Sequence, residues 1–125
     1  MTEGTLITES LRVGATLEGF HLYVNRIYRE KAELSPEQVA NGLSPIWTVI
    51  DFTLGSGEEE RFAEGLSKAL DSFGWYVNFQ SSNESFIVFA GRVFRYLRGD
   101  TDGRKQAQSY AREQGVPETQ LDWTM

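Results

Sequence analysis

The stretch ESFIVFAGRVFRYLRGD (residues 84–100) decides the fold, because its apolar residues run on both sides of an Ala90-Gly91 dipeptide. A tight turn at that dipeptide folds the stretch into a β-hairpin in which Phe89 lies opposite Arg92. One face then carries Ile87, Phe89, Phe94, Tyr96 and Arg92, and the other carries Phe86, Val88, Val93 and Arg95. A surface hairpin is usually polar on one side, so both faces of this hairpin need cover. We expect the C-terminal helix, with Leu121 and Trp123 of the tail, to cover Phe86, Val88 and Val93. A second subunit is the alternative.

Outward from the hairpin, the periodicity of the chain predicts four further strands and two helices. The strands are expected at 5–13 (between Gly4 and Gly14), 20–30, 45–54 and 75–80, and the helices at 57–73 and 100–115. Short turns between neighbouring strands favour antiparallel pairing. The chain is therefore predicted to form a single α+β domain over residues 1–125. Its mainly antiparallel sheet has about five to six strands, with one long helix packed on a face and a second helix near the C-terminus.

Local signals mark the ends of these elements. Ser35, Pro36 and Gln38 predict a capped helical turn over 34–42 that stops at Gly42. Ser56 and Glu59 predict a capping box for the long helix, with Gly74 as its stop. The buried stripe of that helix is expected to comprise Phe62, Leu66, Ala69, Leu70 and Phe73. In the strand at 20–30, strict alternation places Ile27 on the face of His21 and Tyr23.

Composition excludes several kinds of site. The chain has no cysteine, which excludes disulfides, thiolate nucleophiles and cysteine-based metal sites. Its first ten residues lack the pattern of a signal peptide, and no apolar run approaches the length of a membrane span. We therefore expect a cytoplasmic protein that does not enter a membrane.

The charge of the chain is unevenly distributed. The net charge is −6, and residues 1–60 hold four basic and ten acidic side chains against eight of each in 61–125. Six basic residues lie within 92–112. The overall acidity argues against a nucleic-acid partner, although a locally positive segment can orient a partner or an anionic ligand.

No pattern in the chain indicates an enzyme. The single histidine, His21, lies on an alternating strand without a helical His/Glu pairing, and the glutamates 58–60 are typical of a helix N-terminus. No nucleophile elbow, Walker A loop or dinucleotide fingerprint occurs. We expect no metal and no cofactor.

The arginines of the opening stretch are the best candidates for a binding surface. One strand face carries Arg92, Phe94, Tyr96 and Arg98. Aromatic residues beside arginine can contact a protein partner, an anionic small ligand or single-stranded nucleic acid. They can also simply pair with other groups of the same chain. The candidate binding residues are Arg92, Arg95, Tyr96, Arg98, Trp75, Tyr23, His21 and Asp51.

The segment ESFIVFAGRVFRYLRGD and the later GVPETQLDW together resemble small bacterial proteins with this type of hairpin, helix and tryptophan-ended tail. The resemblance covers the C-terminal half and implies no named family, activity or functional residue.

Two functions remain open from the sequence. The first is a regulatory, inhibitor or immunity-type module that acts by protein–protein contact, as a monomer or homodimer. In one version the partner is basic and faces the acidic residues Glu30, Glu33, Glu37, Asp51 and Glu58–Glu60. The second is a small enzyme or ligand-binding domain that holds an anionic small molecule between the sheet and a helix, with groups drawn from His21, Tyr23, Asp51, Tyr76, Asn78, Arg92 and Arg95.

Overall fold

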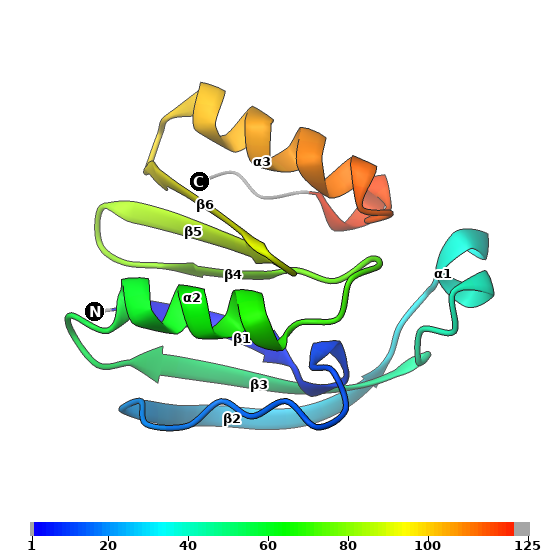
Figure 1. Ribbon diagram of the computed structural model, residues 1–125, viewed down its shortest axis with the longest axis horizontal. Helices are drawn as coiled ribbons and strands as arrows, with labels where there is room; N and C mark the ends of the chain where they lie inside the picture. The colour runs from blue at the N-terminus through cyan, green and yellow to red at the C-terminus, as the bar shows by residue number, and fades with distance from the viewer. Residues whose placement is uncertain (1, 122–125) are drawn as a thin grey trace.

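The computed structural model describes residues 2–121 and shows a mixed α+β architecture, as predicted (Figure 1). Its six strands form one antiparallel sheet in the order β2-β3-β1-β4-β5-β6, so β1 lies in the middle of the sheet between β3 and β4. The strands are β1 (Thr2–Ile7), β2 (Leu22–Lys31), β3 (Ile46–Leu54), β4 (Val77–Gln80), β5 (Glu84–Phe89) and β6 (Arg92–Leu97). The helices are α1 (Pro36–Ala40), α2 (Glu59–Ala69) and α3 (Thr101–Glu113), with short 3-10 turns η1 (Thr8–Ser10) and η2 (Glu118–Gln120). Over this range, the apolar content and length of each helix fall short of what a membrane crossing needs.

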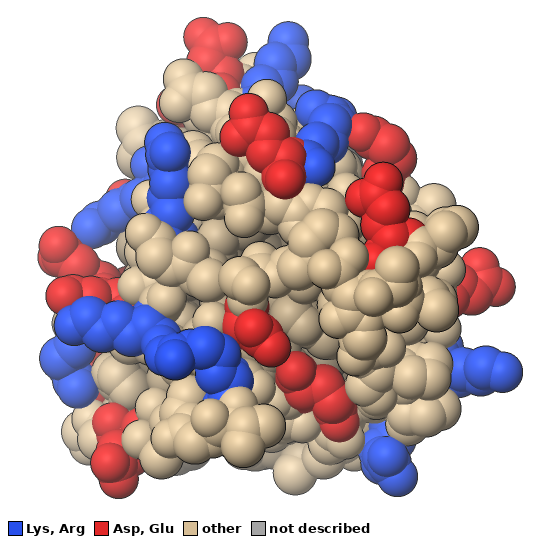
Figure 2. Space-filling view, turned by 45° about the vertical axis from the view of Figure 1, so that its right-hand side comes forward, with Lys and Arg blue, Asp and Glu red and all other residues tan. Residues whose placement is uncertain are grey.

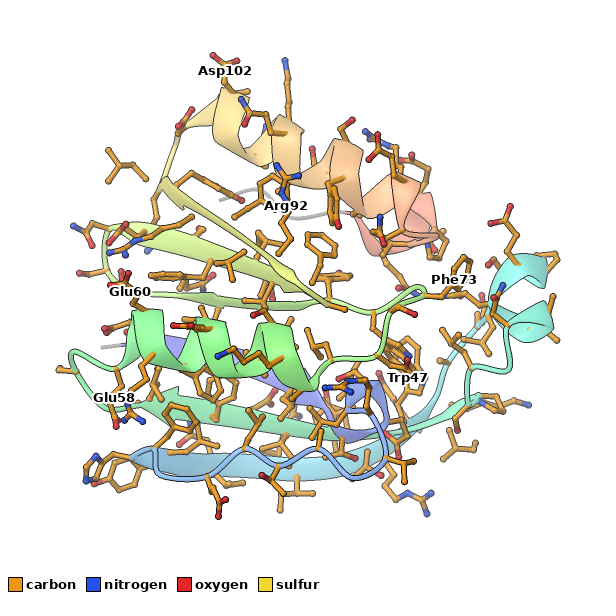
Figure 3. All side chains as sticks on the ribbon, in the orientation of Figure 1. Trp47, Glu58, Glu60, Phe73, Arg92 and Asp102 are labelled. Carbon is orange, nitrogen blue, oxygen red and sulfur yellow. The ribbon has the colours of Figure 1, made fainter. Side chains whose placement is uncertain are left out.

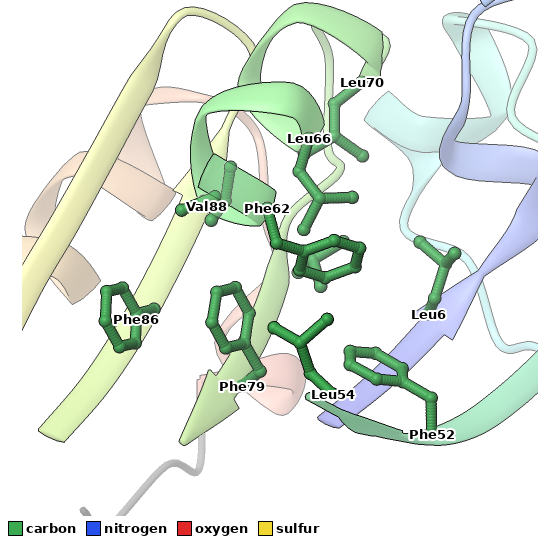
Figure 4. Packing of buried hydrophobic residues seen from close by; sticks show 11 residues of the cluster. Leu6, Phe52, Leu54, Phe62, Leu66, Leu70, Phe79, Phe86 and Val88 are labelled. Atoms are coloured by element: carbon green, nitrogen blue, oxygen red, sulfur yellow. The ribbon is translucent and has the colours of Figure 1, made fainter. Parts of the chain in front are cut away.

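Helix α2 builds the main core on one face of the sheet. Phe62 and Leu66 are fully buried beneath it, and the Phe62 ring meets the rings of Phe52 and Phe79 edge to face (Figure 4). Such an arrangement suits the charge distribution of aromatic rings. The cluster comprises Leu6, Phe52, Leu54, Phe62, Ala63, Leu66, Leu70, Val77, Phe79, Phe86 and Val88. The predicted burial of Phe62, Leu66, Ala69 and Leu70 is confirmed, although Leu70 lies just beyond the helix, and Phe73 is only half-buried.

Helix α2 is shorter than the predicted 57–73. Glu58 occupies the N-cap position without a side-chain cap, so the predicted capping box of Ser56 and Glu59 is wrong. The helix ends at Ala69 because the next residue, Leu70, pairs in an antiparallel bridge with Leu11. The backbone N–H of Asp71 then donates to the carbonyl of Ser10 (2.7 Å). Extended pairing therefore replaces the last helical turn, and Phe73 lies in the connection to β4.

The hairpin of β5 and β6 has the predicted register, with Phe89 opposite Arg92 and Val88 opposite Val93. Gly91 turns the chain with φ +76°, a conformation that glycine adopts without steric cost. The prediction of what covers each face is wrong. Helix α2 covers Phe86 and Val88, whereas α3 and the segment after it cover the opposite face. That second cluster comprises Ile87, Phe89, Tyr96, Ala107, Ala111, Val116 and Leu121. The predicted contribution of Trp123 lies outside the described residues.

Strand β2 departs from strict alternation. Its pairing with β3 shifts between Val24 and Arg26, which leaves Asn25 as a bulge. Because one extra residue reverses the direction of every later side chain, Ile27 pairs with Ile50 and lies on the α2 face. The predicted placement of Ile27 beside Tyr23 is therefore wrong.

Several local predictions hold. Ser35 and Gln38 form the predicted capping box of α1, with Pro36 in its first turn. Asp100 caps α3 by accepting from the N–H of Gly103 (3.1 Å). The first strand is the main exception. It covers Thr2–Ile7 rather than 5–13, because η1 turns the chain immediately afterwards.

Candidate binding cleft at the end of the sheet

The predicted site residues do not form one surface. Figure 3 shows Glu58 and Glu60 at one end of the molecule and Trp47 and Phe73 at the other, with Arg92 beneath α3. Most of the predicted residues contact other groups of the same chain.

Arg92 and Arg95 lie on opposite faces of the hairpin. The Arg92 guanidinium lies over the rings of Phe94 (4.7 Å) and Tyr110 (4.9 Å), between β6 and α3. Arg95 lies on the α2 side and donates to both carboxylate oxygens of Glu84 (2.6 and 3.0 Å). This bidentate pair lowers the pKa of Glu84. Both arginines are therefore engaged in structural contacts.

The other members of the predicted set have structural partners or stand apart. Tyr96 is buried below α3, and this burial raises the pKa of its phenol. The backbone N–H of Arg98 donates to the Asn83 carbonyl (2.9 Å). Tyr23 is exposed on the edge strand β2. Nδ1 of His21 lies 3.3 Å from Oε1 of Glu58. This histidine is therefore a surface residue with an acidic neighbour.

The acidic residues expected to face a basic partner are likewise dispersed. The Asp51 carboxylate accepts from Arg26 Nε (2.9 Å), and Glu58 accepts from Arg61 (2.8 Å). Glu59 accepts from the hydroxyl of Thr2 (2.7 Å). These three carboxylates are therefore already engaged by groups of the same chain.

Among the predicted residues, Trp75 lines the larger of the hollows considered below. We call this hollow the end cleft. It lies where the turn after β1, the end of α1 and the connection from α2 to β4 meet, and its volume is about 570 Å³. Figure 2 turns this end of the molecule toward the viewer and shows acidic and basic side chains around a largely uncharged surface. The lining residues are Thr8, Glu9, Leu11, Val13, Asn41, Gly42, Leu43, Ser44, Asp71, Ser72, Phe73 and Trp75.

The aromatic side of the end cleft is held by contacts with β3 and with the end of α3. The Trp75 ring packs on Trp47 with 5.3 Å between ring centroids. The backbone N–H of Gly74 donates to the carbonyl of Gln114 at the end of α3 (2.8 Å). Phe73 lies against Gly115, where any side chain would collide with its ring. Residues 73–75 are therefore fixed before any ligand binds.

The acidic side of the end cleft carries two carboxylates. Glu9 accepts from the backbone N–H of Thr48 (2.6 Å) and from its hydroxyl (2.9 Å). Burial opposes ionisation of Glu9, but these hydrogen bonds outweigh it and the pKa is lowered. Asp71 is exposed and accepts from the backbone N–H of Ser72 (2.9 Å). Within residues 2–121 neither carboxylate forms an ion pair.

This combination suits a cation with an apolar stem. Lysine and arginine side chains pack their methylene groups on apolar surface while the charged head reaches polar partners, and carboxylates form charge-assisted hydrogen bonds with that head. No histidine lines the cleft, so its serine and threonine hydroxyls have no neighbouring imidazole base. In the part of the chain that is described, no three potential metal ligands come together.

Sequence reasoning missed Glu9, Asp71 and Phe73 as members of this site. Helical periodicity predicts Phe73 in the stripe of the long helix, whereas the preceding Asp71-Ser72 is a turn-forming pair that indicates an earlier helix end. No local pattern indicates that Glu9 and Asp71 would lie at one cleft.

Comparisons of the chain with family models, curated proteins and solved structures found no match.

Proposed function

We propose that this protein is a cytoplasmic binding module that acts by protein–protein contact, and that the end cleft receives a basic side chain of its partner. The observation that carries the proposal is the pair of carboxylates without a cationic partner, Glu9 and Asp71, beside the aromatic residues Phe73 and Trp75. A lysine or arginine of the partner would place its stem on the rings and its charge near the carboxylates. An inhibitor or immunity-type role is one form of this function.

The charge of the whole chain supports a basic partner. With a net charge of −6, the protein attracts a positively charged surface at long range, which accelerates association more than it strengthens the final complex. Such attraction weakens as salt screens the charges. The proposed complex should therefore form more slowly at high ionic strength.

The alternative of an anionic ligand between sheet and helix finds less support. The space between α2 and the sheet is filled by the main core. Two of the groups expected to hold the ligand, Arg92 and Arg95, lie on opposite faces of the sheet. A negatively charged ligand would also be repelled by the carboxylates of the end cleft.

The test is affinity capture from the native lysate with two matched variants. Glu9→Gln with Asp71→Asn removes both cleft charges, and Asp102→Asn with Glu113→Gln removes the same charge from exposed positions on α3. We expect the wild type and the α3 variant to recover the same stoichiometric protein, and the cleft variant to bind it at least about tenfold more weakly, as expected for loss of a charge-assisted contact. Recovery of no stoichiometric partner, or equal binding by both variants, would contradict the proposal.

A further inference from the structure

A second hollow lies on the part of the sheet that α3 leaves uncovered. Helix α3 packs over β5 and β6, whereas around Asp51 on the same face the strands β4, β1, β3 and β2 present polar side chains. These surround a shallow depression of about 350 Å³, which we call the sheet-face basin. The side chains that line it belong to Glu3, Thr5, Asn25, Asp51, Asn78 and Gln80.

The polar groups of the basin follow the strand register. Arg26, Asp51, Thr5 and Asn78 are direct neighbours across four strands. Asp51 accepts from Arg26 Nε (2.9 Å) and from the hydroxyl of Thr5 (2.9 Å). Asn25 donates to the hydroxyl of Thr53 (2.8 Å). These hydrogen bonds fix the side chains on rigid strands, which reduces the entropy lost when a ligand binds.

Two carboxamides in the basin have unused hydrogen-bonding capacity. Asn78 and Gln80 are half-buried on the same face of β4, and neither side chain makes a hydrogen bond with the described residues. Each offers two N–H donors and one carbonyl acceptor. The neighbour of Gln80 in the register is the buried Ser85, which lies opposite Tyr96 on β6 and outside the basin. The two carboxamides are accessible from the basin, so their donors and acceptors can be used by a polar ligand.

The charges of the basin favour a neutral ligand. The charge of Asp51 is balanced by Arg26 at 2.9 Å, and the remaining charged side chain in the lining is the exposed carboxylate of Glu3. A phosphate or carboxylate ligand would therefore meet no cation that is free to bind it. Amides beside a carboxylate instead match hydroxyl groups, which both donate and accept hydrogen bonds.

A neighbouring hollow supplies apolar surface. It shares Thr5 and Asn78 with the basin, holds about 300 Å³, and is lined further along by Trp47, Trp75 and Tyr76. Ligand sites commonly join a few placed polar groups to an aromatic wall. A polyhydroxylated ring has polar edges and a less polar C–H face, and this combination offers contacts to both.

We propose that the sheet-face basin binds a neutral saccharide through the carboxamides of Asn78 and Gln80 and the fixed carboxylate of Asp51. This site is separate from the end cleft, so the proposal does not depend on the proposed protein contact. Because the basin is shallow and open, the affinity should lie in the range of about 1 mM, or about 4 kcal/mol.

The experiment is a titration of the uniformly ¹⁵N-labelled full chain, followed by amide NMR. The probes are glucose, galactose, mannose, N-acetylglucosamine, maltose and cellobiose, each raised to tens of millimolar. We expect saturable shifts of the Asn78 and Gln80 side-chain amides with at least one probe. Asn78→Ala and Gln80→Ala should each weaken that binding at least about tenfold and leave the melting temperature close to that of the wild type.

A matched control and a competing anion complete the test. Gln106→Ala removes an exposed carboxamide from α3 and should leave the titration unchanged. Inorganic phosphate should produce no saturable shift in the basin. The proposal is overturned if none of the six sugars shifts these amides, if the β4 variants bind as well as the wild type, or if phosphate binds there more tightly than every sugar.

Discussion

Gly4 lies in the middle of β1, where the neighbouring strands leave no room for a side chain. A Cβ at this position would lie 2.5 Å from Cβ of Phe79 and 2.8 Å from the ring of Phe52. We predict that Gly4→Ala lowers the free energy of unfolding by about 1–3 kcal/mol, the usual cost of overpacking. Urea denaturation measures this, with Glu3→Ala, an exposed change on the same strand, as the control. Equal stability of the two variants would mean that β1 can shift to admit a methyl group.

Glu9 should make the stability of the fold depend on pH. Its pKa is lowered from the ordinary value of 4.5, so the folded protein binds the proton less readily than the unfolded chain. The stabilisation is therefore fully present above about pH 4.5 and is lost as the pH falls through the lower folded pKa. We predict that Glu9→Gln costs about 1 kcal/mol at pH 7, because a charged acceptor is lost, and that the difference from the wild type shrinks in acid.

Urea melts of the wild type and Glu9→Gln at a series of pH values test this prediction. Glu113→Gln, an exposed change on α3, is the matched control and should follow the wild type at every pH. If the free energies of unfolding of Glu9→Gln and the wild type differed by the same amount at every pH, the charge of Glu9 would contribute nothing to stability. The hydrogen bonds from Thr48 would then not depend on that charge.

At the scale of single elements, the two strands of the hairpin allow a direct comparison between a buried and a partly exposed valine. Val88 and Val93 are direct neighbours on the α2 face, yet Val88 is 0% exposed and Val93 is 38% exposed. We predict that Val88→Glu costs more than about 4 kcal/mol and unfolds the protein, since it buries an unpaired charge. Val93→Glu should cost less than about 1 kcal/mol, because its carboxylate can reach water. Circular dichroism with urea melts measures both, and a folded Val88→Glu protein would contradict the packing of α2.

The same hairpin shows which features of an element can be predicted from sequence. Its register was predictable because Ala90-Gly91 fixes the turn, and the turn fixes every pair. The elements that cover the hairpin could not be predicted, because both of its faces are apolar and the pattern does not indicate which helix packs on which face. The bulge at Asn25 and the early end of α2 were missed for a related reason. Each is produced by pairing with a segment distant in sequence, which overrides local periodicity.

At the scale of the whole molecule, the end cleft was predicted only through Trp75. Its lining comes from three segments spread between residues 8 and 75, and their meeting depends on the order of strands in the sheet. The sequence supplied the class of fold, an acidic chain and a list of candidates. The sequence does not predict that Arg95 and Arg92 have the structural partners Glu84 and Tyr110, because these contacts depend on the packing of β5 and α3.

The segment after α3 completes the second core, which leads to a prediction for the intact chain. Val116 and Leu121 are buried with Ile87 and Phe89 below α3. We predict that a chain ending at Gly115 exposes this face and self-associates or unfolds. Burial of each large apolar side chain stabilises the fold by about 1.5–3 kcal/mol, and the truncation removes two of them. Sedimentation and circular dichroism of the truncated protein measure the outcome. A folded monomer would show that α3 alone is sufficient cover.

The central position of β1 has a consequence for how the chain is made. A ribosome synthesises β1 before its two sheet neighbours, and those neighbours, β3 and β4, end at residues 54 and 80. The first strand can therefore pair with β3 once residue 54 has been made, whereas its other edge stays open until β4 follows. Contacts between such distant parts of a chain slow folding. The three strands β2, β3 and β1 can consequently pair within the N-terminal half, and the second edge of β1 is filled only after β4 has emerged from the exit tunnel.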